Sequence, residues 1–154
     1  MAYEATEVAV SKSQEQIRKL IYTHKGTGVL LVSRPPHEGF EAFIEIDKTP
    51  FHVRIMAVCK AVTKDKYGWK RSDANYAKAV EQENRRVWRV LYWHLKAIFE
   101  AADSGVIDIR NVIMPYVVLK DGMTLSDHVV PRMAELMTMD SSKLLGSGGT
   151  HVQD

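Results

Sequence analysis

Residues 40–58 read FEAFIEIDKTPFHVRIMAV and contain two runs in which apolar and polar side chains alternate. The apolar positions are Phe40, Ala42, Ile44 and Ile46 in the first run and Phe51, Val53, Ile55 and Ala57 in the second. Alternation with a period of two is typical of β-strands that turn one face to a core and the other partly to water. Pro50 separates the two runs and marks a turn. These residues therefore predict two neighbouring strands of an antiparallel sheet.

The residues before this stretch add a third strand and a helix. The run GVLLVS at residues 28–33 has strand length, and the breakers Pro35, Pro36 and Gly39 separate it from the next strand. Residues 11–26, SKSQEQIRKLIYTHKG, carry Ile17, Leu20, Ile21 and His24 at helical spacing. Ser11 with Gln14 and Ser13 with Gln16 both match a capping box, and Gly26 ends the predicted helix.

A long helix follows the sheet. Ser72 or Asp73 is a suitable N-cap, and Gly105 after Ser104 closes the helix about thirty residues later. Its main apolar stripe consists of Tyr76, Val80, Val87, Leu91, Leu95, Ile98 and Ala102. We expect this helix to cross the covered face of the sheet.

The C-terminal part is predicted to contain short elements. One or two helical turns are expected in IDIRNVIMP, residues 107–115, and YVVL at residues 116–119 reads as a brief strand that ends in the turn Lys120-Asp121-Gly122. Thr124 with Asp127 caps a last helix, which Pro131 interrupts or restarts. From residue 140 the chain is rich in glycine and serine, which predicts a flexible tail over residues 140–154.

The predicted fold is thus a single α+β domain over residues 1–139. It has an N-terminal helix, a three-stranded antiparallel meander, a long central helix and a short C-terminal strand and helix.

Composition narrows the class of protein. The chain has 154 residues, of which 45% are hydrophobic and 26% charged, so we expect one folded domain without long disordered regions. The formal net charge of +2 is too small to indicate a polyanion partner by itself. Cys59 is the only cysteine, which excludes an internal disulfide and favours a buried, inert thiol. The chain lacks an apolar run of about 18 residues and a signal-peptide pattern, so we expect a cytoplasmic protein without a membrane partner.

The sequence contains no recognisable catalytic motif. Its six histidines, His24, His37, His52, His94, His128 and His151, lack metal-ligand spacing, and no glycine-rich phosphate loop is present. The adjacent pairs His37-Glu38 and Asp127-His128 have poor geometry for sharing a proton or a metal. His94 lies on the apolar helix, where we expect a hydrogen-bonded core histidine. These observations predict a protein without catalytic residues, metal or cofactor.

The connector before the long helix carries the strongest local signal for a polyanion partner. Between residues 60 and 71 it holds Lys60, Lys64, Lys66, Lys70 and Arg71, with Tyr67 and Trp69 among them and only Asp65 opposing. Cations in a loop can hold phosphates while aromatic rings between them stack on bases, although a solvated basic loop has the same composition. On the long helix, Arg85 and Arg89 share one face and form either a phosphate-contacting ridge or a solvated edge paired with Glu81 and Glu83.

The aromatic residues of the long helix allow three interpretations. Trp88, Tyr92, Trp93 and Phe99 lie off the main apolar stripe. A helix that is apolar on several faces is either buried between layers or presents a face to a partner. Burial within the chain, an interface of a homo-oligomer, and base stacking are therefore all possible roles, and the predicted oligomer interface consists of these four residues.

Residues 34–40, RPPHEGF, carry a resemblance to the double-stranded-RNA-binding domain. The predicted order of a helix, three strands and a helix resembles that domain, whose first hairpin loop holds a Pro-x-His element before a strand phenylalanine. Pro35, Pro36, His37 and Phe40 would occupy these positions. The family opens its second helix with a Lys-Lys-x-Ala-Lys phosphate clamp, whereas this chain has SDANYAKAV and only Lys78 is available.

A second resemblance covers roughly residues 10–136. The stretches RVWRVLYWHLKAIFEAADSGV and IMPYVVLKDGMTLSDHV are similar to a group of small proteins of tailed bacteriophages and prophages. The matching features are Trp88-Arg89, Leu95-Lys96-Ala97 with Glu100, Gly105, Pro115-Tyr116, and Asp121-Gly122 with Thr124. The resemblance implies a phage setting in the host cytoplasm and no particular mechanism.

The function expected from these residues is nucleic-acid binding, on single strands or duplex, by a non-catalytic phage accessory protein that acts as an oligomer. The predicted contact residues are Lys64, Lys66, Tyr67, Trp69, Lys70, Arg71, Arg85 and Arg89. The alternative is a protein that binds a host protein or sequesters a signalling nucleotide.

Overall fold

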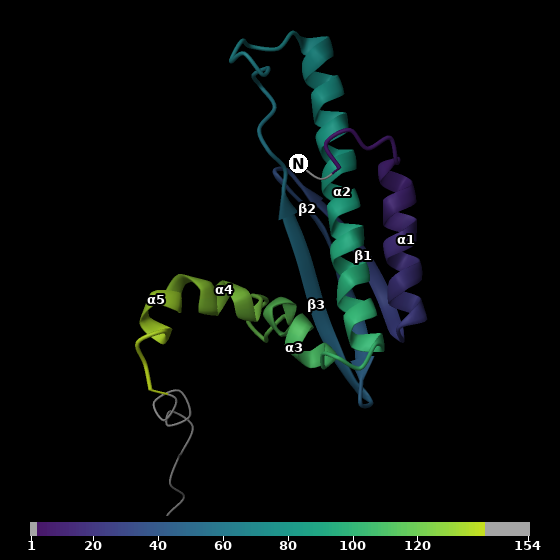
Figure 1. Ribbon diagram of the computed structural model, residues 1–154, viewed down its shortest axis with the longest axis vertical. Coiled ribbons are helices and arrows are strands. Elements are labelled where there is room, and N and C mark those ends of the chain that lie inside the picture. Colours follow the sequence, from purple (N-terminus) through teal and green to yellow (C-terminus); the bar gives the residue numbers. More distant parts are fainter. Residues whose placement is uncertain (1–2, 141–154) are drawn as a thin grey trace, which may run out of the picture.

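The chain folds into a helix, a three-stranded sheet, a long helix and a series of short C-terminal helices, as seen in the computed structural model (Figure 1). Residues 3–140 are described, so the predicted tail lies outside the described residues except for Asp140. The elements are α1 (Val10–Thr23), β1 (Gly26–Arg34), β2 (His37–Ile46), β3 (Thr49–Val58), α2 (Asp73–Asp103), α3 (Ile109–Ile113), η1 (Met114–Tyr116), α4 (Leu125–Val129), η2 (Val130–Arg132) and α5 (Met133–Leu136). The predicted α+β class and the order of the main elements are confirmed.

The sheet is the predicted antiparallel meander with strand order β1-β2-β3. Phe40 pairs with Leu31 on β1 and with Ile55 on β3. The turn between β2 and β3 consists of Asp47 and Lys48, both with positive φ, as a tight two-residue hairpin requires. Alternation along the strands is also confirmed, because Phe40 is fully buried whereas Phe43 is 46% exposed on the opposite face.

Both α1 and α2 cover the same face of this sheet (Figure 1). The core lies between them and the strands and includes Ile17 and Ile21 of α1. The predicted stripe of α2 is buried over Val87, Leu91, Leu95 and Ile98, whereas Tyr76 near the start of the helix is 45% exposed. The long helix therefore crosses the covered face as expected, but only its C-terminal two thirds contribute to the core.

Two aromatic residues assigned to an oligomer interface lie in the core instead. Trp88 and Phe99 are each 1% exposed. Trp88 reaches the sheet, where its Nε1 donates a hydrogen bond of 3.2 Å to Glu38 Oε2, and the Phe99 ring stacks on His24. Both residues lie off the main stripe because α2 packs against two partners, the sheet and α1, and needs apolar side chains toward each.

The helix ends follow the predictions in part. Ser72 caps α2 by accepting a hydrogen bond from Asn75 N, and Gly105 follows its end with a φ of 71°. The capping boxes predicted at Ser11 and Ser13 are wrong. The first helix begins at Val10, and Ala9 provides no side-chain cap, so both serines lie inside the first turns.

The C-terminal part leaves the body of the domain beside β3 (Figure 1). The strand predicted at residues 116–119 is reduced to two isolated bridges, Val53 with Val117 and Val118 with Thr124. The capping box of Thr124 and Asp127 is confirmed. Beyond it, α4, η2 and α5 extend away from the body, and we call residues 125–140 the arm. Within residues 3–140, no helix combines the length and the apolar character that a membrane span requires.

Gly39 tests the packing of the sheet. A Cβ atom at this position would lie 2.2 Å from the Ile55 carbonyl oxygen and 2.7 Å from Met56 Sδ, whereas one at Gly28 in β1 would meet no atom within 4 Å. We predict that Gly39→Ala lowers the free energy of unfolding by about 3 kcal/mol, because the strands must separate to admit the methyl group. Urea denaturation followed by circular dichroism measures the change. Gly28→Ala is the matched control, and equal stability of the two variants would contradict the described packing.

Candidate nucleic-acid interface

The connector between β3 and α2, residues 59–72, runs beside the N-terminal part of α2 and ends in a structured tip (Figure 1). Lys64 and Lys70 face each other in an isolated antiparallel bridge. Between them, the Asp65 carboxylate accepts hydrogen bonds of 2.9 Å from both Tyr67 N and Trp69 N. Gly68 has a φ of 85°, which allows the chain to reverse direction. The tip is therefore a closed turn held by its single carboxylate.

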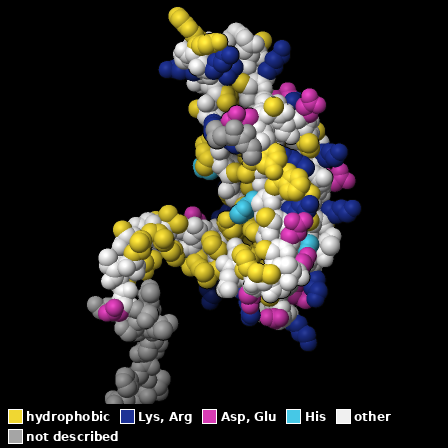
Figure 2. Space-filling model, in the orientation of Figure 1, with side chains coloured by type: hydrophobic (Ala, Val, Ile, Leu, Met, Phe, Trp, Pro, Cys, Tyr) yellow, Lys and Arg dark blue, Asp and Glu magenta, His cyan; other side chains and the backbone are white. Residues whose placement is uncertain are grey.

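This turn displays its two aromatic rings to solvent. Tyr67 is 72% exposed and Trp69 is 75% exposed. The Lys66 ammonium lies 4.8 Å from the centre of the Tyr67 ring, so a cation and an aromatic face are presented together. In Figure 2, hydrophobic and basic side chains stand side by side at this end of the molecule.

A cleft of about 710 Å³ lies between the connector and α2. Six of its lining residues carry a positive charge, namely Lys60, Lys64, Lys66, Arg71, Lys78 and Arg86, and three are acidic, namely Glu4, Asp65 and Glu83. The excess of cations over carboxylates in one concave surface concentrates a positive potential that a net charge of +2 over the whole chain conceals.

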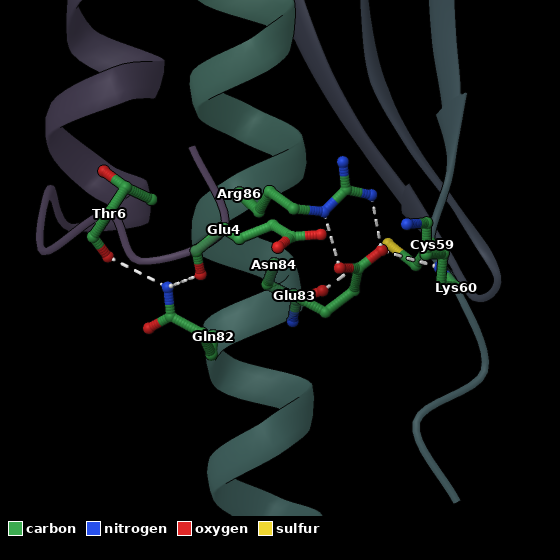
Figure 3. Close-up of polar contacts among 8 residues, drawn as sticks. All are labelled: Glu4, Thr6, Cys59, Lys60, Gln82, Glu83, Asn84 and Arg86. Atoms are coloured by element: carbon green, nitrogen blue, oxygen red, sulfur yellow. Dashed lines mark hydrogen bonds and ion pairs between the residues drawn. The ribbon is translucent and has the colours of Figure 1, made fainter. Parts of the chain in front are cut away.

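The Glu83 carboxylate anchors the connector to α2 (Figure 3). It is 8% exposed and accepts hydrogen bonds of 2.7 Å from Arg86 Nε, from Arg86 Nη2 and from the backbone N–H of Lys60. The hydrogen bonds from Arg86 lower the pKa of Glu83 below its ordinary value, against burial, which raises it. The same pairing raises the pKa of Arg86. A charged carboxylate thus holds one wall of the cleft against the other.

The segment before α1 closes another side of the cleft. Gln82 Nε2 donates hydrogen bonds to the carbonyl oxygens of Glu4, at 2.9 Å, and Thr6, at 3.1 Å (Figure 3). Since Gln82 and Glu83 are consecutive on α2, one turn of this helix binds both flanking segments.

The structure brings together six of the eight residues predicted to contact nucleic acid. Lys64, Lys66 and Arg71 line the cleft. Tyr67, Trp69 and Lys70 belong to the adjoining tip.

Arg85 and Arg89 lie apart from the cleft. Arg85 pairs with Glu81, as the alternative interpretation expects. Arg89 Nη1 donates to Gln16 Oε1 of α1 at 2.7 Å and lies over the rings of Tyr92 and Trp93. Neither residue lines the cleft, so they do not add to its basic surface.

Three cleft residues are absent from the predicted set. These are Lys60, Lys78 and Arg86. A sequence signal for two of them exists, because Lys78, Gln82 and Arg86 are spaced by four residues and share one helix face. That face becomes recognisable as functional only when the connector is seen opposite to it.

The two remaining aromatic residues of the predicted oligomer interface are at the surface. Tyr92 is half-buried and Trp93 is 37% exposed. Tyr3 stacks on Trp93 with ring centres 6.4 Å apart, and Lys96 approaches the same ring at 4.7 Å. Their contact with a second copy stays a prediction.

The histidines and the cysteine differ from their expected environments. His94 is exposed rather than in the core, and its Nε2 contacts Tyr116 Oη at 2.8 Å. His37 is exposed. Cys59 is half-buried, and burial raises the pKa of its thiol, which disfavours a thiolate. No group of three His, Cys, Asp or Glu side chains that could hold a metal ion occurs in residues 3–140.

Comparison of the chain with protein-family models, curated proteins and solved structures finds no match.

The Glu83 anchor predicts a specific dependence of stability on pH. Its folded-state pKa lies below the ordinary value of 4.5, so the unfolded chain binds the proton first as the pH falls. We predict that Glu83→Gln lowers the free energy of unfolding by about 2 kcal/mol at neutral pH. This difference from the wild type should persist down to pH 4.5 and shrink below it.

Urea denaturation at a series of pH values measures this difference. Glu81→Gln is the control, because Glu81 lies on the same helix with a side chain that is 63% exposed. A difference between wild type and Glu83→Gln that stays constant through the acidic range would exclude the proposed anchor.

Proposed function

We propose that this protein binds nucleic acid through the basic cleft and the connector tip, without catalysing a reaction. The observation that carries the proposal is the convergence of six Lys and Arg side chains on one cleft beside two exposed aromatic rings. Cations neutralise phosphates without regard to sequence, and aromatic rings stack on unpaired bases.

Several of these cations are available to a ligand. Lys64, Lys66 and Lys78 form no ion pair with any residue in the described part of the chain, although all three line the cleft. Arg71 and Arg86 are held in place, by the Lys64 carbonyl oxygen and by Glu83 respectively. The cleft thus combines two guanidinium groups held by hydrogen bonds with the ammonium groups of these three lysines, which suits a backbone of repeating phosphates.

The resemblances noted in the sequence are compatible with this function. The order of α1, the three strands and α2 is the order of the double-stranded-RNA-binding domain, and the Pro35-Pro36 turn borders the N-terminal half of α2. Lys78 lies in the second turn of α2, the helix that carries the lysine clamp in that family, and it lines the cleft. The resemblance to phage proteins would place this activity in the cytoplasm of an infected host.

The proposal includes a second copy of the chain, bound through the arm. The arm exposes Val130, Met133 and Met137, which are 60%, 48% and 82% exposed, and the main contacts of its short helices are with η1 and with one another. Helices of four or five residues are marginal alone in water, so a surface that covers them would stabilise the arm.

The open face of the sheet in a second copy is suited to cover the arm. Leu30 and Phe43 are exposed there, and a hollow of about 430 Å³ on that face contains Arg34 and His37. The arm has three carboxylates against one arginine, so its charge complements this hollow. Each copy starts its arm beside this face, because Arg54 Nη1 donates to the Gly122 carbonyl oxygen at 2.8 Å.

Charge reversal in the cleft tests nucleic-acid binding. We predict that Lys66→Glu combined with Lys78→Glu weakens binding and reduces the slope of log affinity against log salt by about 1.4 for single strands or 1.8 for duplex. Fluorescence polarisation with labelled single-stranded DNA, duplex DNA and RNA over a salt series measures both quantities.

Lys12→Glu with Lys19→Glu is the matched control, because it changes the net charge equally on the exposed side of α1. If the two double variants lost the same affinity for nucleic acid, the loss would come from the net charge of the protein and not from the cleft. No binding by the wild type at low salt would refute the proposal and favour a host protein or a signalling nucleotide as the partner.

The role of the arm has its own test. We predict that wild-type protein is a dimer or larger and that Met133→Asp with Met137→Asp yields monomers, because charged groups cannot enter an apolar contact. Light scattering coupled to size exclusion measures the mass. Thr138→Asp, at an exposed position of the same arm, should leave the mass unchanged. A wild-type monomer at high concentration would exclude the contact.

A further inference from the structure

A second hollow of about 270 Å³ opens directly beside the basic cleft. The two share Lys60, Ala61, Val62 and Glu83 as a common wall. The hollow lies between the β1–β2 turn, the start of the connector and α2. A ligand whose phosphates occupy the cleft would therefore have its neighbouring groups at the mouth of this hollow.

The walls of the hollow are mainly apolar. Pro35, Pro36, Val62, Tyr76 and Val80 provide them. Tyr76 is 45% exposed, and its ring contacts no other aromatic ring in the described residues. A narrow apolar hollow with one unstacked tyrosine ring is suited to a flat group that inserts edge first.

A buried carboxylate is among the residues that line the hollow. Glu38 is 7% exposed, and its only hydrogen bonds within residues 3–140 come from Ser33 Oγ, at 2.6 Å, and Trp88 Nε1, at 3.2 Å. No cation pairs with it in that part of the chain. Each carboxylate oxygen can accept two hydrogen bonds, so Glu38 retains acceptor capacity toward the hollow. A buried carboxylate with two neutral donors gains from a further donor.

Asn84 adds a second polar group to the hollow (Figure 3). Its Oδ1 accepts a long hydrogen bond of 3.6 Å from Cys59 Sγ. An amide beside a carboxylate offers both a donor and acceptors, which is the combination that proteins use to recognise the edge of a base.

We infer that this hollow receives one unstacked nucleobase with an exocyclic amino group, from a strand whose phosphates lie in the cleft. The amino group donates to Glu38 and the ring stacks on Tyr76. Thymine and uracil are disfavoured, because they have one N–H between two carbonyl oxygens that the carboxylate repels. The inference rests on the proposed function and extends it to single-stranded or locally unpaired nucleic acid, since a paired base cannot enter.

Three single-stranded DNA probes test the inference, namely oligo(dA), oligo(dC) and oligo(dT), each of about 12 nucleotides and bound at one fixed salt concentration. We expect oligo(dA) and oligo(dC) to bind about tenfold more tightly than oligo(dT), because a charge-assisted hydrogen bond is lost with thymine. Glu38→Gln should reduce this preference to less than about twofold while leaving the salt dependence unchanged.

A second variant is needed because Glu38 also binds Trp88 in the core. Tyr76 is exposed, so Tyr76→Ala should fold normally and weaken binding of oligo(dA) and oligo(dC) by about tenfold, again with an unchanged salt slope. Tyr22→Ala is the control, because Tyr22 is 57% exposed on α1 and lines neither the cleft nor the hollow.

The possible outcomes separate the inference from the proposed function. Equal affinity for the three oligonucleotides, unaffected by Tyr76→Ala, would overturn the base pocket and leave binding in the cleft intact. Binding of duplex in preference to all three single strands would also overturn it. No binding of any oligonucleotide at low salt would overturn both.

Discussion

A difference in length between α2 and the sheet creates the candidate site. At 1.5 Å per residue, the 31 residues of α2 span about 46 Å, whereas the ten residues of β2 span about 34 Å. The helix must therefore extend beyond the sheet, and its buried residues start only at Glu83. The connector runs along the projecting part of α2 to reach the cap at Ser72 (Figure 1). The cleft lies between these two segments.

Glu83 is the residue at which the helix leaves the core, and it explains why the cleft has a defined shape. Without a link, a basic connector beside a basic helix face would be repelled from it. The Glu83 carboxylate supplies the opposite charge and is bonded to both sides, through Lys60 N and the Arg86 guanidinium. In the tip of the connector, the Asp65 carboxylate accepts hydrogen bonds from two backbone N–H groups of the same turn. Two carboxylates thus hold a surface that carries six cations.

The candidate site could be predicted from the sequence only along one segment. The cations and aromatic residues of the connector are close together in the chain, so their association follows from adjacency. Lys78 and Arg86 belong to α2, and their contribution depends on which face of a long helix the connector approaches. Arg85 and Arg89 are basic residues of the same helix, but Arg85 pairs with Glu81 and Arg89 contacts Gln16 of α1 instead. Successive side chains on a helix point about 100° apart, so a shift of one position is enough to move a side chain from the cleft to a different surface.

Local periodicity in the chain was sufficient to predict the strands, the long helix, its cap at Ser72 and the capping box at Thr124, because these depend on neighbours within a few residues. Burial of Trp88 and Phe99 was one of the interpretations that a helix apolar on several faces allowed, and the packing of α2 against both the sheet and α1 decided between them. The strand expected at residues 116–119 shrank to two isolated bridges, of which the one between Val117 and Val53 joins it to β3. The cleft and the hollow beside it arise from the overhang of one element past another. The extent of this overhang depends on how whole elements are placed relative to one another. The pattern of residues along the chain gives only the length of each element.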